Sequence, residues 1–134
     1  MAKVIAFSNQ KGGVGKTTSC INIAAALGKA GHRVLLVDLD PQGNTTSGIG
    51  IAKKSIKYTI YDVIMGESTV QDAIIVTKFK NLHAIASTVD LAGAELELRP
   101  SEGTCASLFY RNYKIAEIDL WNEQLINRRI SRLP

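Results

Sequence analysis

Residues 9–19 read NQKGGVGKTTS, and this stretch decides the class of fold that the rest of the chain can adopt. Its end, Gly15-Lys16-Thr17, completes the phosphate-binding pattern G-x-x-x-x-G-K-[ST], which joins a strand to a helix. The pattern also requires a glycine five residues before Gly15, and position 10 is Gln. The stretch therefore predicts an unusual phosphate-binding loop, which opens with Gln10 and carries an additional lysine, Lys11.

The segments on both sides of this loop predict a strand, a helix and a second strand. Residues 3–8 (KVIAFS) form a short apolar run typical of a buried strand, and residues 16–30 place Cys20 on the apolar face of a helix. Residues 33–38 (RVLLVD) are apolar without alternation, as in a strand that is covered on both faces. This order predicts a βαβ unit with a right-handed crossover.

The following residues continue the alternation of strands and helices. Residues 41–57 are dense in Gly, Ser and Thr and are predicted to form a loop, followed by a short helix at 58–66. Residues 70–76 fit a helix or a strand, whereas residues 82–87 predict a third strand and residues 90–98 a helix. The predicted fold class is α/β, with a mostly parallel sheet flanked by helices.

The composition limits the classes of protein that need to be considered. A chain of 134 residues with 46% hydrophobic residues fits one modest domain with a real core. The net charge of +4 permits contact with nucleic acid or an anionic surface without requiring it. Cys20 and Cys105 lack the spacing of metal ligands and are expected to be cytosolic thiols, with Cys20 buried. No apolar run reaches the length of a membrane span.

The loop carries the groups that a polyphosphate needs. A turn from a strand into a helix points several backbone N–H groups at one spot, where the helix dipole favours an anion. Glycines at positions 12, 13 and 15 let the backbone curl around a phosphate. Lys16 can then reach the outer phosphates, and Thr17 offers a hydroxyl to Mg²⁺. The alternative is a structural glycine-rich turn before a helix.

Lys11 has three interpretations, which its position alone leaves open. Its long cationic side chain could neutralise charge on the nucleotide of its own subunit. It could extend across a dimer interface to the nucleotide of a partner, as an arginine finger does in phosphoryl transfer. It could also be a solvated surface lysine.

Three segments resemble the ParA/Soj partitioning ATPases, in the order in which that family has them. They are KGGVGKTT (11–18), VDLDPQGNTTSGIG (37–50) and IASTVDLAGAELEL (85–98). The first resembles the deviant Walker loop of a class that also includes MinD-like and nitrogenase iron-protein relatives, and the second favours the ParA/Soj branch. The resemblance extends over residues 3–98 and implies a P-loop NTPase-type fold.

The resemblance also implies a role for each matching residue of the loop. Lys11 would contact the nucleotide of the partner subunit across a sandwich dimer, and Lys16 would act on the phosphates of its own nucleotide. ATP would be held by Lys11, Gly12, Gly13, Val14, Gly15, Lys16, Thr17 and Thr18.

Two aspartates at the end of the second predicted strand would complete the site. Asp38 and Asp40 lie where parallel strands end, at the edge of the sheet where such folds bind ligands. The resemblance implies that Asp40 orients the attacking water, so that Lys11, Lys16 and Asp40 are the catalytic residues. It also implies that Thr17 and Asp38 lie at the Mg²⁺ ion.

For the whole protein, the resemblance implies a slow ATPase of chromosome or plasmid partitioning. Members of the family form an ATP-dependent homodimer, bind DNA without sequence specificity and are stimulated by a ParB-type partner. Soj-like members also regulate the initiation of replication or sporulation. A protein of this kind is expected in the cytoplasm, on the nucleoid and without a membrane partner.

The resemblance ends after Leu98, where the composition also changes. Residues 1–98 contain nine Lys and one Arg, whereas residues 99–134 contain one Lys and five Arg. The Asp-Cys-Pro-Pro type motif that completes the family's Mg²⁺ site is missing, and Asp119 is its nearest imitation. The chain is therefore predicted to consist of an ATPase part with a truncated sheet, residues 1–98, and a divergent tail, residues 99–134.

The tail has two explanations, a second module or translation in a shifted reading frame. The frame shift is favoured, because it also accounts for the missing motif. A helix over residues 118–133 would not separate its apolar from its basic side chains, which argues against a membrane-binding helix. Two functions stay open: a partitioning ATPase, or a truncated, catalytically inactive fragment that at most binds nucleotide or a partner subunit.

Overall fold

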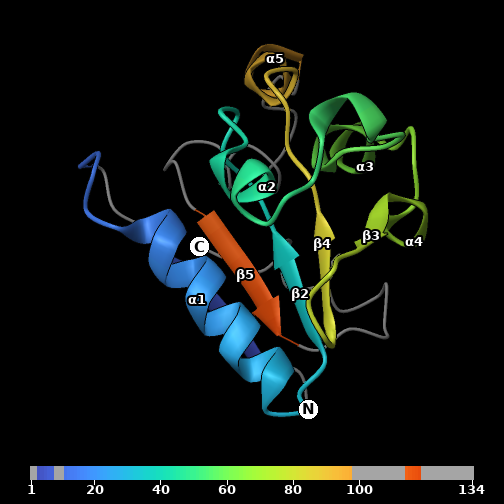
Figure 1. Cartoon of the computed structure of the whole chain (residues 1–134). Helices are drawn as coiled ribbons and strands as arrows, with labels where there is room; N and C mark the ends of the chain where they lie inside the picture. The colour runs from blue at the N-terminus through green and yellow to red at the C-terminus, as the bar shows by residue number, and fades with distance from the viewer. Residues whose placement is uncertain (1–2, 8–10, 98–113, 119–134) are drawn as a thin grey trace.

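The computed structural model describes residues 3–7, 11–97 and 114–118. Within these ranges the chain forms five strands that share one sheet, with helices around it (Figure 1). The strands are β1 (Lys3–Phe7), β2 (Val34–Val37), β3 (Ile74–Val76), β4 (Leu82–Ile85) and β5 (Lys114–Ile118). The helices are α1 (Lys16–Lys29), α2 (Asn44–Gly48), α3 (Ile60–Met65), α4 (Val70–Ala73) and α5 (Leu91–Glu97), with a 3₁₀ turn η1 (Lys53–Ser55).

The strands lie in the order β1-β5-β2-β4-β3, and the sheet is mixed. β2 and β4 are parallel, whereas β5 is antiparallel to both β1 and β2, and β3 is antiparallel to β4. β1, β2 and β4 therefore run in one direction, as expected for a P-loop NTPase-type fold. β5 and β3 run the other way, so the described sheet is mixed rather than wholly parallel.

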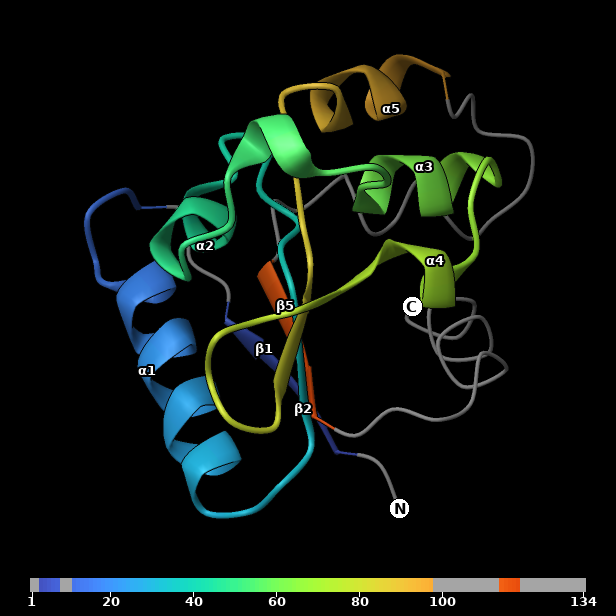
Figure 2. The same cartoon turned by 45° about the vertical axis from the view of Figure 1, so that its right-hand side comes forward.

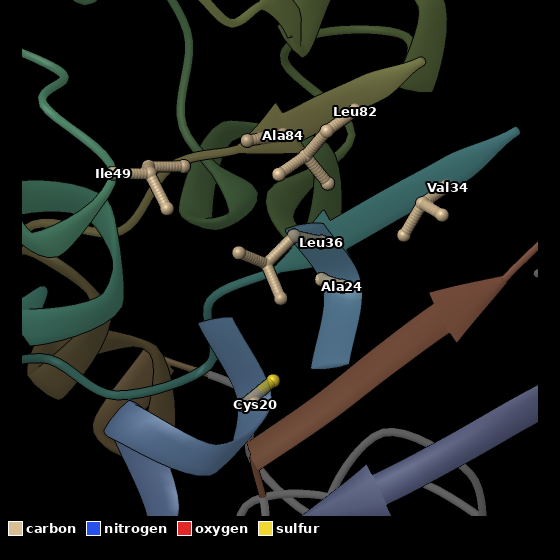
Figure 3. Close-up of a cluster of buried hydrophobic side chains, with 7 residues drawn as sticks. All are labelled: Cys20, Ala24, Val34, Leu36, Ile49, Leu82 and Ala84. Carbon is tan, nitrogen blue, oxygen red and sulfur yellow. The ribbon is translucent and has the colours of Figure 1, made fainter. Parts of the chain in front are cut away.

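Alternate side chains of β2 face two different layers of helices. Val34 and Leu36 pack against α1 in a cluster with Cys20, which confirms that this cysteine is buried (Figure 3). Leu35 faces the opposite layer, where a second cluster contains residues of α3, α4 and α5. Figure 2 shows α1 on one face of the sheet and α3 and α4 on the other. The unbroken apolar run of β2 thus reflects a strand covered on both faces, as predicted.

The first strand differs from its prediction, because it is largely exposed. Val4 and Ile5 are 40% and 37% exposed, and only Phe7 is partly buried against the α1 cluster. β1 lies at the edge of the sheet and pairs with β5 alone among the described strands. Its apolar residues therefore gain little burial within the described part of the chain, although they still favour an extended conformation.

Several shorter elements refine the predicted boundaries. The predicted loop 41–57 contains α2, whose N-cap Gly43 has a left-handed conformation, and the 3₁₀ turn η1. The segment 70–76 is both a helix and a strand, since α4 is followed at once by β3. α3 begins with a capping box between Thr59 and Asp62 and ends at Gly66, which has a left-handed conformation with φ of 77°.

None of the helices in the described ranges is long and apolar enough to cross a membrane. Most of the predicted divergent tail, including Asp119 and the segment that was considered as a membrane helix, lies outside the described residues. Within the tail, the structure describes β5 alone.

Candidate nucleotide-binding site

The glycine-rich loop leads into the first turn of α1. Gly13 and Gly15 have φ of 71° and 83°, in the left-handed region that other residues rarely adopt. A Cβ atom at Gly12 or Gly13 would meet no protein atom within 4 Å. Packing against the described protein therefore does not require glycine at position 12, and the space beside the loop backbone is open to a ligand.

The N-terminus of α1 lacks the groups that normally stabilise a helix start. Gly15 is the N-cap and provides no side chain, and the first turn contains no acidic residue. A cation, Lys16, occupies the first helical position instead, and its Nζ donates a hydrogen bond to the carbonyl oxygen of Lys11 at 2.8 Å. A cation near the positive end of the helix dipole is unfavourable unless an anion shares the place. The lysine and the uncapped N–H groups together suit a phosphate.

The other residues predicted to hold the nucleotide lie on the same turn. Val14 is exposed beside the glycines, and Thr18 is exposed on the first turn of α1. Thr17 is partly buried on that turn, and Lys11 is exposed at the start of the loop. The structure therefore brings all eight predicted nucleotide-binding residues into one loop and one helix turn.

The two aspartates follow β2 and have different surroundings. Asp38 is only 2% exposed. Its Oδ2 accepts hydrogen bonds from the backbone N–H of Thr46 at 2.8 Å and from the Thr46 hydroxyl at 2.9 Å. Its Oδ1 accepts one from the backbone N–H of Asp40 at 3.2 Å. Asp40 is partly buried, and its Oδ1 accepts a hydrogen bond from the backbone N–H of Gln42 at 3.0 Å.

Both aspartates lie at the end of the sheet that also carries the loop. β1 and β2 run in the same direction, so their carboxyl ends point to the same edge. α2 packs against α1, and a Cβ at Gly48 would come within 2.6 Å of Ile21 Cδ1 (Figure 1). The loop, Asp38 and Asp40 therefore gather where the connections leave the carboxyl ends of parallel strands, the usual ligand site of such folds.

The donor set fits Mg²⁺ that arrives with a nucleotide. The described residues contain no group of three or more His, Cys, Asp or Glu that could hold a metal ion by themselves. Mg²⁺ is commonly held by one or two protein oxygens, phosphate oxygens and water, rather than by a full protein cage. The Thr17 hydroxyl, on the first turn of α1, provides an oxygen of this kind beside the loop. Both oxygens of Asp38 already accept hydrogen bonds from the protein.

β5 occupies an informative place in the sheet. It lies between β1 and β2, and Lys114 pairs with Phe7 while Ile118 pairs with Lys3. The strand therefore starts at the end of the sheet that carries the loop and finishes at the opposite end. Asp119 follows that opposite end in sequence and lies outside the described residues. Because β5 runs away from the loop, its carboxyl end does not lie where the missing Asp-Cys-Pro-Pro type motif would reach the Mg²⁺ site.

The sequence missed two residues at this site, Thr46 and Ser87. The Thr46 hydroxyl accepts a hydrogen bond from the backbone N–H of Ser87 at 3.0 Å, in addition to its bonds with Asp38. Thr46 was predicted to lie in a loop, because residues 41–57 are dense in Gly, Ser and Thr. The sequence signal that could have indicated this role is the pair Thr45-Thr46, which follows the Asp-x-Asp motif at the end of the strand.

The glycine loop between a strand and a helix, and the acidic residues at the next strand end, define a P-loop NTPase-type α/β fold. The chain belongs to the AAA domain family, whose family model matches residues 2–120, and within that family to the ParA/Soj branch.

Two curated relatives support this placement. The chain is 52% identical over 101 residues to the sporulation initiation inhibitor protein Soj of Bacillus subtilis (strain 168), which covers 75% of this chain and 40% of Soj. It is 51% identical over 96 residues to the chromosome partitioning protein ParA of Caulobacter vibrioides (strain NA1000 / CB15N), with coverage of 72% and 36%. The chain thus spans about two fifths of the length of these relatives.

A solved structure with a bound nucleotide is also similar. Cobyrinic acid a,c-diamide synthase from Mycobacterium smegmatis, solved with bound ADP and magnesium, has a TM-score of 0.67 and 41% sequence identity. The match covers 72% of this chain and 39% of the synthase.

Proposed function

We propose that this chain binds ATP with Mg²⁺ at residues 11–18 and belongs to the ATPase machinery of chromosome or plasmid partitioning. The observation that carries the proposal is the start of α1, where the N-cap Gly15 has no side chain and Lys16 bonds back to Lys11 across a loop with two left-handed glycines. The nucleotide and magnesium in a similar solved structure, and the Soj and ParA relatives, support it.

In this proposal the loop backbone and Lys16 bind the phosphates. The N–H groups of residues 12–18 surround the β-phosphate, and Lys16 neutralises the outer phosphates from the first helical position. Thr17 would provide a hydroxyl oxygen to Mg²⁺, and the ion would neutralise phosphate charge. Asp40 would orient the attacking water. Asp38 would lie near the shell of the metal.

Lys11 serves a second subunit in this proposal. Its carbonyl oxygen accepts the hydrogen bond of Lys16, and the residue is exposed at the start of the loop. A cation at this position can reach the nucleotide of a facing copy of the chain and stabilise the charge of phosphoryl transfer in trans. The dimer would then require ATP, because the two nucleotides lie in the interface.

The partners follow from the family and stand as proposals for this chain. They are a second copy of the chain, a ParB-type protein that stimulates hydrolysis, and DNA bound without sequence specificity. The protein would act in the cytoplasm, on the nucleoid. The relatives named for chromosome partitioning and for inhibition of sporulation initiation support this list.

A second candidate function is a catalytically inactive fragment that binds nucleotide or a partner subunit. The direction of β5 favours it, because this strand carries its carboxyl end away from the loop. In this case residues 99–134 form a divergent tail that a shifted reading frame produced. One of the two other reading frames of the gene after the codon for Leu98 would then encode an aliphatic strand ending in Asp-Cys-Pro-Pro or a similar motif.

Equilibrium binding of a fluorescent ATP analogue tests the proposal. We expect Mg²⁺-dependent binding that Lys16→Ala weakens by about 10- to 100-fold, as for the loss of one charge-assisted hydrogen bond. Unchanged affinity in that variant would refute the assignment of the loop. Phosphate release then separates the candidates, because binding without hydrolysis supports the inactive fragment.

A further inference from the structure

Three residues from separate elements form a buried hydrogen-bonded unit. Asp38 follows β2, Thr46 lies in α2 and Ser87 follows β4. All three are buried, with 2%, 1% and 0% of their surface exposed. We call this unit the Asp38–Thr46–Ser87 brace.

The hydrogen bonds of the brace have a definite direction. The Thr46 hydroxyl has one proton, which it donates to Asp38 Oδ2 at 2.9 Å, and its oxygen accepts the Ser87 N–H at 3.0 Å. The Thr46 N–H donates to the same Oδ2 at 2.8 Å. One carboxylate oxygen therefore receives two bonds from one residue, which determines the orientation of the whole carboxylate. Chains of hydrogen bonds in a buried site strengthen one another.

The other carboxylate oxygen of Asp38 links the brace to residues 40–43, which contain Asp40. Asp38 Oδ1 accepts the N–H of Asp40 at 3.2 Å, so the orientation of Asp38 determines where the backbone of Asp40 lies. The segment that follows packs on the end of β4. A Cβ at Gly43 would come within 2.6 Å of the Ser87 carbonyl oxygen, and Gly43 has φ of 60°. The brace and this close contact hold residues 40–43 against Ser87 from two sides.

We propose that Thr46 is a positioning residue. It orients the Asp38 carboxylate and, through that carboxylate, the backbone of Asp40. Residues 40–43 and the end of β4 therefore become more ordered together when a nucleotide binds in the loop. In this arrangement Thr46 acts on Asp38, and Asp38 acts on Asp40. The part of the proposal that concerns the nucleotide rests on the proposed function.

Backbone hydrogen exchange of the whole chain, measured by NMR with and without an ATP analogue and Mg²⁺, tests this role. The variants are Thr46→Val, which keeps the shape and loses the hydroxyl, and Thr46→Ser, which restores it. Thr45→Val is the matched control, because Thr45 is the neighbouring buried threonine of α2 and its hydroxyl does not bond Asp38. Without nucleotide, we expect the Ser87 amide to exchange at least about 10-fold faster in Thr46→Val than in Thr45→Val.

With nucleotide, we expect the amides of residues 12–18 to be protected in every variant. The amides of Asp40 and Gln42 should gain protection in the wild type, Thr46→Ser and Thr45→Val, and not in Thr46→Val. Equal protection of these two amides in Thr46→Val would overturn the proposal. If the nucleotide protects the amides of residues 12–18 in none of the proteins, the proposed function fails. The exchange rate of the Ser87 amide without nucleotide then still decides whether the brace exists.

A second test uses the wild type alone and does not depend on the folding of Thr46→Val. The Thr46 hydroxyl is buried and donates to Asp38 Oδ2 at 2.9 Å, so we expect its proton to exchange with water slowly enough to give its own NMR signal. A Thr46 hydroxyl proton that exchanges as fast as those of exposed threonines would overturn the proposal.

Discussion

The phosphate loop and the aspartate segment lie at the same end of the sheet and are built in opposite ways. Residues 11–15 are all exposed, and Lys16 donates a hydrogen bond to the carbonyl oxygen of Lys11 across the turn. Residues 38–46 contain three buried polar side chains, and the carboxylate of Asp38 alone accepts three hydrogen bonds. The loop is shaped for a ligand, whereas the aspartate segment is shaped by the protein itself.

This difference has a consequence for substitutions. In the aspartate segment, removal of a polar group leaves buried partners without a hydrogen bond and lowers the free energy of unfolding. In the loop, removal of a side chain costs little in folding and appears in ligand binding or association. The expected loss of folding free energy therefore falls from the aspartate segment to the loop.

The largest loss is expected for Asp38→Ala. Two N–H groups and the Thr46 hydroxyl lose their acceptor in a buried place, so we expect the free energy of unfolding to fall by about 3 kcal/mol. Urea denaturation measures this change. Asp90→Ala is the control, since Asp90 is exposed and accepts a bond from Thr88 only at the surface, and it should cost less than about 1 kcal/mol. Equal losses in the two variants would contradict the comparison.

A smaller loss is expected for Gly43→Ala. Its φ of 60° strains any other residue, and the new Cβ would lie 2.6 Å from the Ser87 carbonyl oxygen. We expect the free energy of unfolding to fall by about 2 kcal/mol. Gly66→Ala separates the two causes, because Gly66 also has a positive φ and its Cβ would meet nothing within 4 Å. A cost at Gly43 no larger than at Gly66 would mean that the contact with Ser87 is unimportant.

Lys16→Ala should leave the folded state almost unchanged and affect the ligand. We expect the free energy of unfolding to change by less than about 0.5 kcal/mol, while the affinity for an ATP analogue falls by about 10- to 100-fold. Lys29→Ala, at the other end of α1, should change neither quantity. Thermal unfolding without nucleotide and equilibrium binding give the two measurements. A large loss of stability in Lys16→Ala would mean that the loop, like the aspartate segment, contributes to the stability of the fold.

Lys11→Ala should change neither the folding nor the nucleotide affinity of a single subunit. We expect it to abolish ATP-dependent dimerisation, because its side chain serves the partner's nucleotide in the proposed dimer. Light scattering with and without ATP measures the association, and Lys54→Ala is a control at another exposed lysine. Normal dimerisation of Lys11→Ala would identify Lys11 as a solvated surface lysine.

The elements that depend on nearby residues could be predicted from the sequence alone. The loop, α1, the buried Cys20, the doubly covered β2, and a short helix ending at Gly66 follow from glycine placement and from apolar runs. The eight residues predicted to bind nucleotide are contiguous, so their gathering at one turn required no long-range information. For these features, local conformational preference and burial point to the same structure.

Only the tertiary structure decided the partners of Asp38, the exposure of β1 and the direction of β5. Thr46 lies eight residues from Asp38, and Ser87 lies 41 residues from Thr46, so their bonds exist only once α2 and the end of β4 pack together. A strand carries the same apolar run whether it pairs in one direction or the other, and its burial depends on what covers it. Hydrogen-bond partners and strand direction are properties of packed elements, whereas the strand, the loop and the helix of the phosphate site are already specified by local sequence.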